Sequence, residues 1–225
     1  MRKSLRLPPN FSLEKARAFQ KYIAKKAIRH DDFDSAISRV AGVDLTYRGQ
    51  LALAVAVAVD AHTMKHLETQ YAIIEEKFPY IPTLLAFREV GPAALALKRL
   101  KTKVNVVFVD GSGLLHPYKA GFATHLGIVL NVPTIGVTKK LLCGKIGKWH
   151  GNKAPIYLDS EIVGMAVKTI PRANPIYVSI GHKVSLKTAV DLVKYFTKKR
   201  SKLPLPIQLA HNEAQRLARE LLLQQ

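Results

Sequence analysis

The sequence contains little cysteine, no long apolar run and no sign of an internal boundary. Its one cysteine, Cys143, excludes an intrachain disulfide and a zinc cluster assembled from the cysteines of one chain. The longest apolar run, 51–59, has the length of a strand and falls short of the roughly 18 residues that a membrane-spanning helix needs. No linker, repeat or low-complexity tract interrupts the chain. We therefore expect a single domain over residues 1–225.

Acidic residues are scarce in relation to basic ones. The chain has 16 Asp and Glu against 35 Lys and Arg, a formal net charge of +19, which indicates a polyanionic partner. Basic residues are densest in 21–30, 97–103 and 194–202, and these segments alone do not distinguish nucleic acid from an anionic membrane surface. The basic N-terminal segment lacks the apolar core of a secretory signal, so we expect a cytoplasmic protein. We also expect it to act as a monomer.

The spacing of apolar residues predicts an α/β protein. An amphipathic helix is expected over 12–29, followed by an antiparallel meander of strands at 39–47, 51–60 and 65–74. In the second of these strands Leu and Val alternate with Ala, which leaves one face where a helix can pack closely. The remaining chain predicts helices at 84–89, 91–99, 118–131, 185–197 and 206–223, and strands at 104–110, 134–138, 155–159, 161–168 and 175–179. This order predicts a mixed central sheet flanked by helices.

Carboxylates occur at two places where strands are expected. The strand 104–110 ends on Asp110, which by itself is most simply explained as a turn residue. Asp44 lies within the strand 39–47, where a charge is unfavourable unless it is paired or bound to a cation. If these two strands are parallel neighbours, about 4.8 Å apart, the two carboxylates can share a divalent cation. Glu89 and His211 could complete the set, although a surface salt bridge and a helix-surface position would explain them equally well.

Six motifs occur in order from residue 41 to the C-terminal helix. They are "AGVDLTY", "FPYIPTLLAFREVGP", "VVFVDGSGLLHPYKAGFATHLG", "VPTIGVTKKLL", "NPIYVSIGHKVSL" and "PIQLAHNEAQR". Together they resemble the endonuclease V family, which has a ribonuclease H-like fold. The resemblance implies that Asp44, Glu89, Asp110 and His211 form a metal site.

The reaction implied by this resemblance is hydrolysis of the second phosphodiester bond on the 3′ side of inosine, in DNA containing deoxyinosine or in RNA containing inosine. In DNA this cleavage initiates repair of deaminated adenine and leaves 5′-phosphate and 3′-hydroxyl ends. The implied cofactor is Mg²⁺, with Mn²⁺ as a substitute, because hard cations prefer oxygen ligands. Lys139 matches the family lysine near the scissile phosphate, whereas outside its motif it would be one more basic surface residue.

The resemblance also implies residues that bind the base. Gly111 and Gly113 flank Ser112, so a flat base could approach the backbone there, although the same glycines could simply form the turn. Hypoxanthine lacks the exocyclic amine of guanine, and a narrow pocket can discriminate between the two bases. The other pocket residues expected by analogy with the family are Leu85, His116 and Leu142.

The segment "PYIP" resembles the family's wedge. Two prolines stiffen a loop that presents Tyr80 and Ile81, which could fill the gap left by an extruded nucleotide. An ordinary apolar loop tip is the alternative. This chain has Thr83 after the loop, where many relatives have glycine, and this difference bears on the width of the pocket.

Two other functions fit the composition. One is a metal-dependent nuclease that acts on branched or flap structures without a base preference, and the other is a nucleic-acid-binding module without catalysis. The complete set of metal-site residues argues against the second, because a binding module has no need of converging carboxylates. The sequence leaves the choice between DNA and RNA open.

Overall fold

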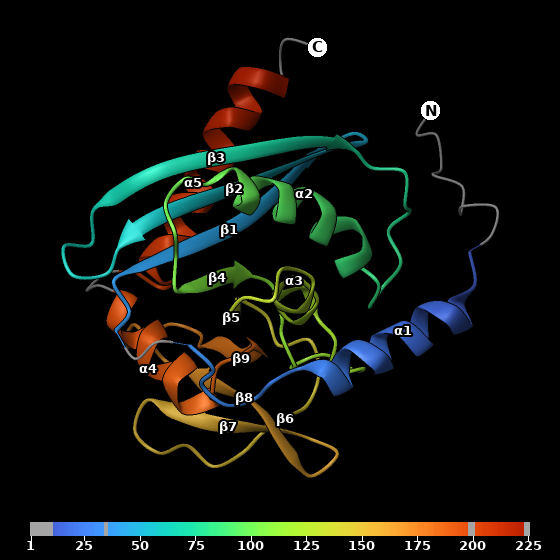
Figure 1. Ribbon diagram of the computed structural model, residues 1–225. Coiled ribbons are helices and arrows are strands. Elements are labelled where there is room, and N and C mark those ends of the chain that lie inside the picture. The colour runs from blue at the N-terminus through green and yellow to red at the C-terminus, as the bar shows by residue number, and fades with distance from the viewer. Residues whose placement is uncertain (1–10, 34–35, 198–200, 223–225) are drawn as a thin grey trace.

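A computed structural model of the chain describes residues 11–33, 36–197 and 201–222 (Figure 1). In this part, helices flank a nine-stranded sheet with the order β3-β2-β1-β4-β5-β9-β8-β7-β6. The strands are β1 (Arg39–Arg48), β2 (Leu51–Asp60), β3 (His66–Glu75), β4 (Val106–Asp110), β5 (Thr134–Thr138), β6 (Lys145–Ile146), β7 (Lys153–Leu158), β8 (Glu161–Val167) and β9 (Ile176–His182). The helices are α1 (Leu13–Lys26), α2 (Ala86–Arg99), α3 (Phe122–Leu130), α4 (Leu186–Phe196) and α5 (Leu205–Leu222). None of these helices is long and apolar enough to span a membrane.

The pairing of the strands confirms the predicted mixed sheet. Strands β1, β2 and β3 form the expected antiparallel meander, while β1 pairs with β4, and β4 with β5, in parallel. Strand β9 then pairs antiparallel with β5. The two-residue strand β6 was not predicted, because so short a segment carries no apolar periodicity.

Three of the predicted helices differ from those observed. The two helices expected over 84–99 form one helix, α2, which continues through Pro92. The preceding residue, Gly91, has no Cβ to clash with the proline ring, so the helical conformation is available to it. The helix expected over 118–131 begins only at Phe122, because Lys119 has a φ of 50°, which a right-handed helix does not contain.

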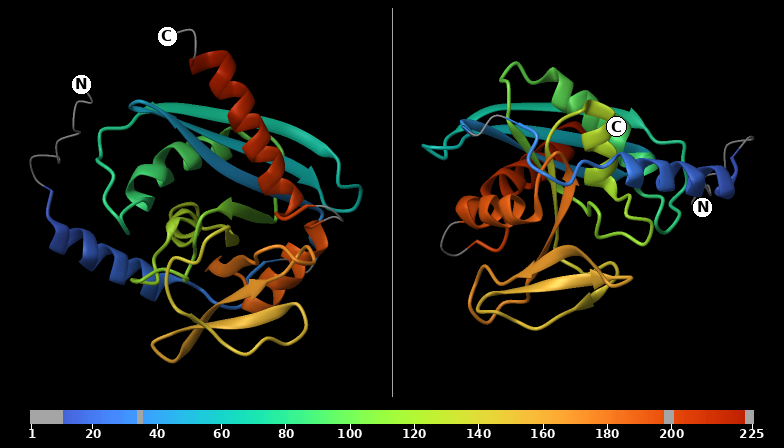
Figure 2. Two further views of the ribbon diagram at one scale, coloured as in Figure 1. Left: turned by 180° about the vertical axis from the view of Figure 1, so that it is seen from behind. Right: turned by 60° about the horizontal axis from the view of Figure 1, so that its bottom comes forward.

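The two faces of β2 pack against different helices. Its alanines, Ala54 and Ala56, form a core cluster with small residues of α2 such as Ala93, as the alternation of Ala with bulkier residues predicted. Its valines, Val55 and Val57, belong to the larger cluster on the opposite face, which includes residues of α4 and α5. Figure 2 shows α5 crossing the back of the meander, on the side opposite to α2 in Figure 1. Helices therefore cover both faces of the meander.

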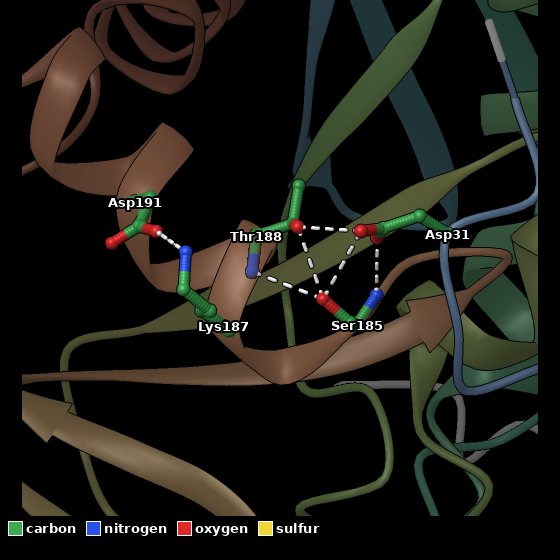
Figure 3. A network of polar contacts seen from close by, with 5 residues as sticks. All are labelled: Asp31, Ser185, Lys187, Thr188 and Asp191. Carbon is green, nitrogen blue, oxygen red and sulfur yellow. Dashed lines mark hydrogen bonds and ion pairs between the residues drawn. The ribbon is translucent and has the colours of Figure 1, made fainter. Parts of the chain in front are cut away.

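The segment after α1 is fastened to the start of α4 by a polar network (Figure 3). The carboxylate of Asp31 accepts hydrogen bonds from the backbone N–H of Ser185, at 2.7 Å, and from the hydroxyl of Thr188, at 2.6 Å. Ser185 in turn caps α4 by accepting from the backbone N–H of Thr188. Burial acts to raise the pKa of Asp31, but these hydrogen bonds outweigh it and lower the pKa. The chain between α1 and β1 is thus anchored on the α4 side of the sheet.

Candidate active site

The parallel pairing of β1 with β4 brings two carboxylates to the same edge of the sheet. Val43 lies opposite Val109 in the register, so Asp44 and Asp110 follow at neighbouring positions. This confirms the adjacency that the sequence made conditional on parallel strands. Asp44 is only 8% exposed and faces the side covered by α5. A carboxylate in this position needs a hydrogen-bond donor or a cation.

Helix α5 supplies the third member of the cluster. The Nδ1 atom of His211 lies 2.7 Å from Oδ2 of Asp44. One ligand atom each from Asp44, Asp110 and His211 lies within 4.8 Å of the others, which is close enough for a single metal ion to contact all three. Two carboxylates and an imidazole suit Mg²⁺ or Mn²⁺, although this donor set does not by itself identify the ion.

Glu89 projects from α2 toward the same cluster without belonging to the group of three. Burial, followed by repulsion from Asp44 and Asp110, raises the pKa of Glu89 to about 8. Burial and the charge of Asp44 likewise raise the pKa of Asp110 to about 6, although Lys139 and His211 oppose the shift. In both residues burial is the larger cause, and the like charge of the neighbouring carboxylates adds to it. A bound divalent cation would offset this like charge.

Lys139 lies directly after β5, the strand next to β4. Its Nζ is 4.0 Å from Oδ2 of Asp110, and about half of its side chain is exposed to solvent. The ammonium group is therefore beside the carboxylate cluster and accessible to an anion from outside. The role near a phosphate that the family resemblance implied for Lys139 stays a prediction.

A pocket of about 140 Å³ adjoins the cluster, and we call it the side pocket. It is lined by Tyr80, Thr83, Leu85, Ala86, Glu89, Asp110, Gly111, Ser112, His116, Gly121, Phe122 and Leu142. Its walls include five of the seven residues expected to bind the substrate, the exceptions being Ile81 and Gly113. A Cβ on Gly113 would lie 2.0 Å from the carbonyl oxygen of Ile180, so this glycine is needed for contact with β9.

Five lining residues carried no base-binding assignment from the sequence: Thr83, Ala86, Ser112, Gly121 and Phe122. Ser112 and Thr83 stand beside residues that the motifs did single out, and their positions were the available signal. Phe122 carried no such signal, because its contact with Gly111 arises only in the fold. Its Cδ1 lies 2.7 Å from where a Cβ on Gly111 would be. The contact explains why residue 111 has no side chain.

Comparisons with known proteins agree with this geometry. The family model for endonuclease V matches residues 21–212. An endonuclease V from Thermofilum pendens is 51% identical over 214 residues, which cover 95% of this chain and 92% of the relative. The chain belongs to the endonuclease V family.

Solved structures of endonuclease V share this fold, which is ribonuclease H-like. The crystal structure of the Streptomyces avermitilis enzyme superposes with a TM-score of 0.86 at 31% identity, covering 97% of this chain and 99% of the other. A Ciona intestinalis endonuclease V, in complex with a 24-mer DNA containing an inosine followed by a ribo-adenosine, gives 0.83 at 30% identity, covering 93% and 98%. Membership in this family makes the protein a nuclease, with a candidate metal site at Asp44, Asp110 and His211.

The raised pKa values predict that the effect of metal on stability depends on pH. In metal-free protein, Asp110 and Glu89 stabilise the fold fully below their ordinary pKa values of 3.8 and 4.5, and the contribution is lost as pH rises through about 6 and about 8. Mg²⁺ binds the ionised carboxylates, so it should raise the melting temperature more near pH 8 than near pH 5. Thermal melting with EDTA or Mg²⁺ at both pH values measures this difference. An equal increase at the two pH values would contradict the assignment.

Proposed function

We propose that the protein hydrolyses the second phosphodiester bond on the 3′ side of inosine, in DNA carrying deoxyinosine or in RNA carrying inosine. One observation carries this proposal: Asp110 belongs to the cluster with Asp44 and His211 and is also a wall of the side pocket, and so is Glu89, whose pKa Asp44 and Asp110 raise. A cavity of about 150 Å³ admits a flat ring the size of benzene, so the side pocket has room to take up much of an extruded base. If a base were held in the side pocket, the nucleic-acid strand that carries it would lie next to the cluster.

The residues of the cluster have distinct parts in this proposal. Asp44, Asp110 and His211 would hold a divalent cation, with Glu89 adding a further negative charge beside them. When bound, Mg²⁺ would supply positive charge that activates a water and offsets charge on the phosphate oxygens. Lys139 would orient the phosphate through its exposed ammonium group. Cleavage would leave 5′-phosphate and 3′-hydroxyl ends.

The side pocket would select the base by its shape. Burial lowers the pKa of His116 to about 4, so the imidazole is neutral at physiological pH. Its Nδ1 accepts from the backbone N–H of Tyr118 at 3.2 Å, which leaves the proton on Nε2, 3.1 Å from the carbonyl oxygen of Thr83. Both ring nitrogens are therefore engaged within the protein, and His116 acts as a fixed wall. A fixed wall would exclude the extra amine of guanine while admitting hypoxanthine.

Cleavage of matched oligonucleotides tests the proposal. The substrates differ only in carrying inosine or guanosine at one position, and they are prepared as DNA and as RNA, with Mg²⁺, Mn²⁺ or EDTA. With either metal we expect cleavage two bonds to the 3′ side of inosine, in strong preference to the guanosine substrate, and mapping of the product ends locates the cut. Metal-dependent cleavage without a base preference would identify a structure-specific nuclease instead. Binding without cleavage under all conditions would indicate a non-catalytic module.

Tyr80 tests the wedge hypothesis. Its side chain is 64% exposed and lines the side pocket, so it can stack on bases next to an extruded nucleotide. We expect Tyr80→Ala to weaken binding of an inosine duplex about 10-fold, in the range found for aromatic stacking on bases, with a smaller loss on single-stranded substrate. Binding curves for paired and single-stranded oligonucleotides measure both effects. Tyr195→Ala, at an exposed tyrosine on α4, is the matched control and should bind normally. Equal losses on both substrates would make Tyr80 a general contact rather than a wedge.

A further inference from the structure

Gln20 is a fully buried polar residue on α1 whose side chain reaches the wall of the side pocket. Its exposed fraction is 0%, and its Nε2 donates a hydrogen bond of 2.6 Å to the backbone carbonyl of Thr83. Its Oε1 accepts from Nη1 of Arg17 at 2.7 Å. Because a guanidinium group can only donate, this contact fixes the orientation of the amide and directs its NH₂ group at Thr83. A buried amide is unfavourable without such partners, so the arrangement is specific.

Thr83 has an unusual backbone conformation. Its φ is 70°, in the left-handed region that favours glycine and is rare for β-branched residues. Such a conformation persists only where the surroundings hold it in place. Here the carbonyl oxygen of Thr83 accepts from Gln20 and also from Nε2 of His116, at 3.1 Å. Two donors from separate segments thus hold the residue that follows the wedge loop, 79–82.

Helix α1 is itself fixed to the body of the protein. Phe19 packs against Phe87 of α2 and His125 of α3, with ring centroids 5.9 and 5.8 Å apart. On the same helix Ile23 is buried, and the guanidinium of Arg17 lies 4.2 Å from the ring centroid of Tyr118. Gln20 is therefore a donor on a rigid support. The family model begins at residue 21, so Gln20 lies outside the matched region.

We propose that Gln20 is a positioning residue that holds Thr83 in the wall of the side pocket and thereby sets the pocket's selectivity for hypoxanthine over guanine. This inference rests on the proposed function. Thr83 and His116 both line the side pocket, and one carbonyl oxygen joins them to Gln20. Without Gln20, the carbonyl oxygen of Thr83 keeps a single side-chain donor, His116, and this side of the wall can move outward. A wider pocket admits the exocyclic amine of guanine, while hypoxanthine still fits.

The test is Gln20→Leu, which keeps the volume of the side chain and removes its donor. We measure kcat and KM for oligonucleotides with inosine or guanosine. The ratio of the two kcat/KM values should fall about 10-fold, the effect of one typical hydrogen bond, with kcat on inosine nearly unchanged because the carboxylate cluster is untouched. The ratio is independent of the fraction of folded enzyme, so partial unfolding cannot produce this result.

Ile23→Ala is the matched control. It removes a buried apolar side chain from the same helix, as a general loosening of α1 would, and leaves the contact between Gln20 and Thr83 in place. We expect its base selectivity to equal that of the wild type, even if its melting temperature falls. An unchanged ratio in Gln20→Leu, or an equal loss in Ile23→Ala, would overturn the inference. A wild-type enzyme that cleaves both substrates equally would instead refute the proposed base specificity.

Discussion

Asp110→Asn is expected to reduce cleavage about 10³-fold or more, since a divalent cation supplies several kcal/mol of transition-state stabilisation and, in the proposed function, Asp110 is one of its charged ligands. Asparagine has nearly the same shape as aspartate, so we expect the fold and much of the nucleic-acid binding to survive. Because burial and the charge of Asp44 raise the pKa of Asp110, the neutral amide should not destabilise the metal-free protein at neutral pH. Single-turnover cleavage, binding and thermal melting measure the three properties separately.

Asp60 provides the matched control, because it also ends a strand but acts as a turn residue. Its Oδ1 accepts from the backbone N–H groups of His62 and Thr63 and from the hydroxyl of Thr63, and it takes no part in the carboxylate cluster. Asp60→Asn should therefore lose at most some stability and retain normal turnover. Near-normal turnover of Asp110→Asn in Mg²⁺ would remove Asp110 from the metal site. Comparison of Asp110→Asn with Asp60→Asn thus distinguishes a metal-binding aspartate from a turn aspartate.

The parts of the site that follow from strand register could be predicted from the sequence. Asp44 and Asp110 each had a defined place in a strand, so parallel pairing sufficed to bring them together. The close approach of α2 to the small-residue face of β2 followed in the same way from the alternation of Ala with Val. These features depend on local periodicity and on one pairing, which a sequence shows.

The features of the site that depend on contacts between segments distant in the sequence could not be predicted. Gln20 and Thr83 are 63 positions apart, and the contact of the buried amide with the Thr83 carbonyl has no local signature in the sequence. The close approach of Gly113 to the backbone of Ile180 was not predicted either, and the assignment of Gly113 to the base stays a prediction. The continuity of α2 through Pro92 was missed because proline usually ends a helix, and the glycine before it relieves the clash.

The close packing of α5 on β1 makes the metal site sensitive to a residue that touches no substrate. A Cβ on Gly42 would lie 2.0 Å from the carbonyl oxygen of Pro206, in the first turn of α5. Gly42 is two residues before Asp44, and α5 carries His211, whose Nδ1 is 2.7 Å from the Asp44 carboxylate. Because Gly42 lets α5 pack close to β1, it sets the distance between His211 and Asp44.

Gly42→Ala is accordingly expected to lower the free energy of unfolding by about 3 kcal/mol, as overpacking of a well-packed core does. The folded fraction should also cleave about 10²-fold more slowly, because displacement of α5 moves His211 away from Asp44. Urea titration and single-turnover rates, corrected for the folded fraction, measure the two effects. Val193→Ala is the control: it removes a fully buried side chain from α4, which carries no residue of the cluster, so it should lower stability while its folded fraction cleaves normally. Normal turnover of folded Gly42→Ala would show that the cluster tolerates a shift of α5, and His211 would then lose its proposed part in holding the metal.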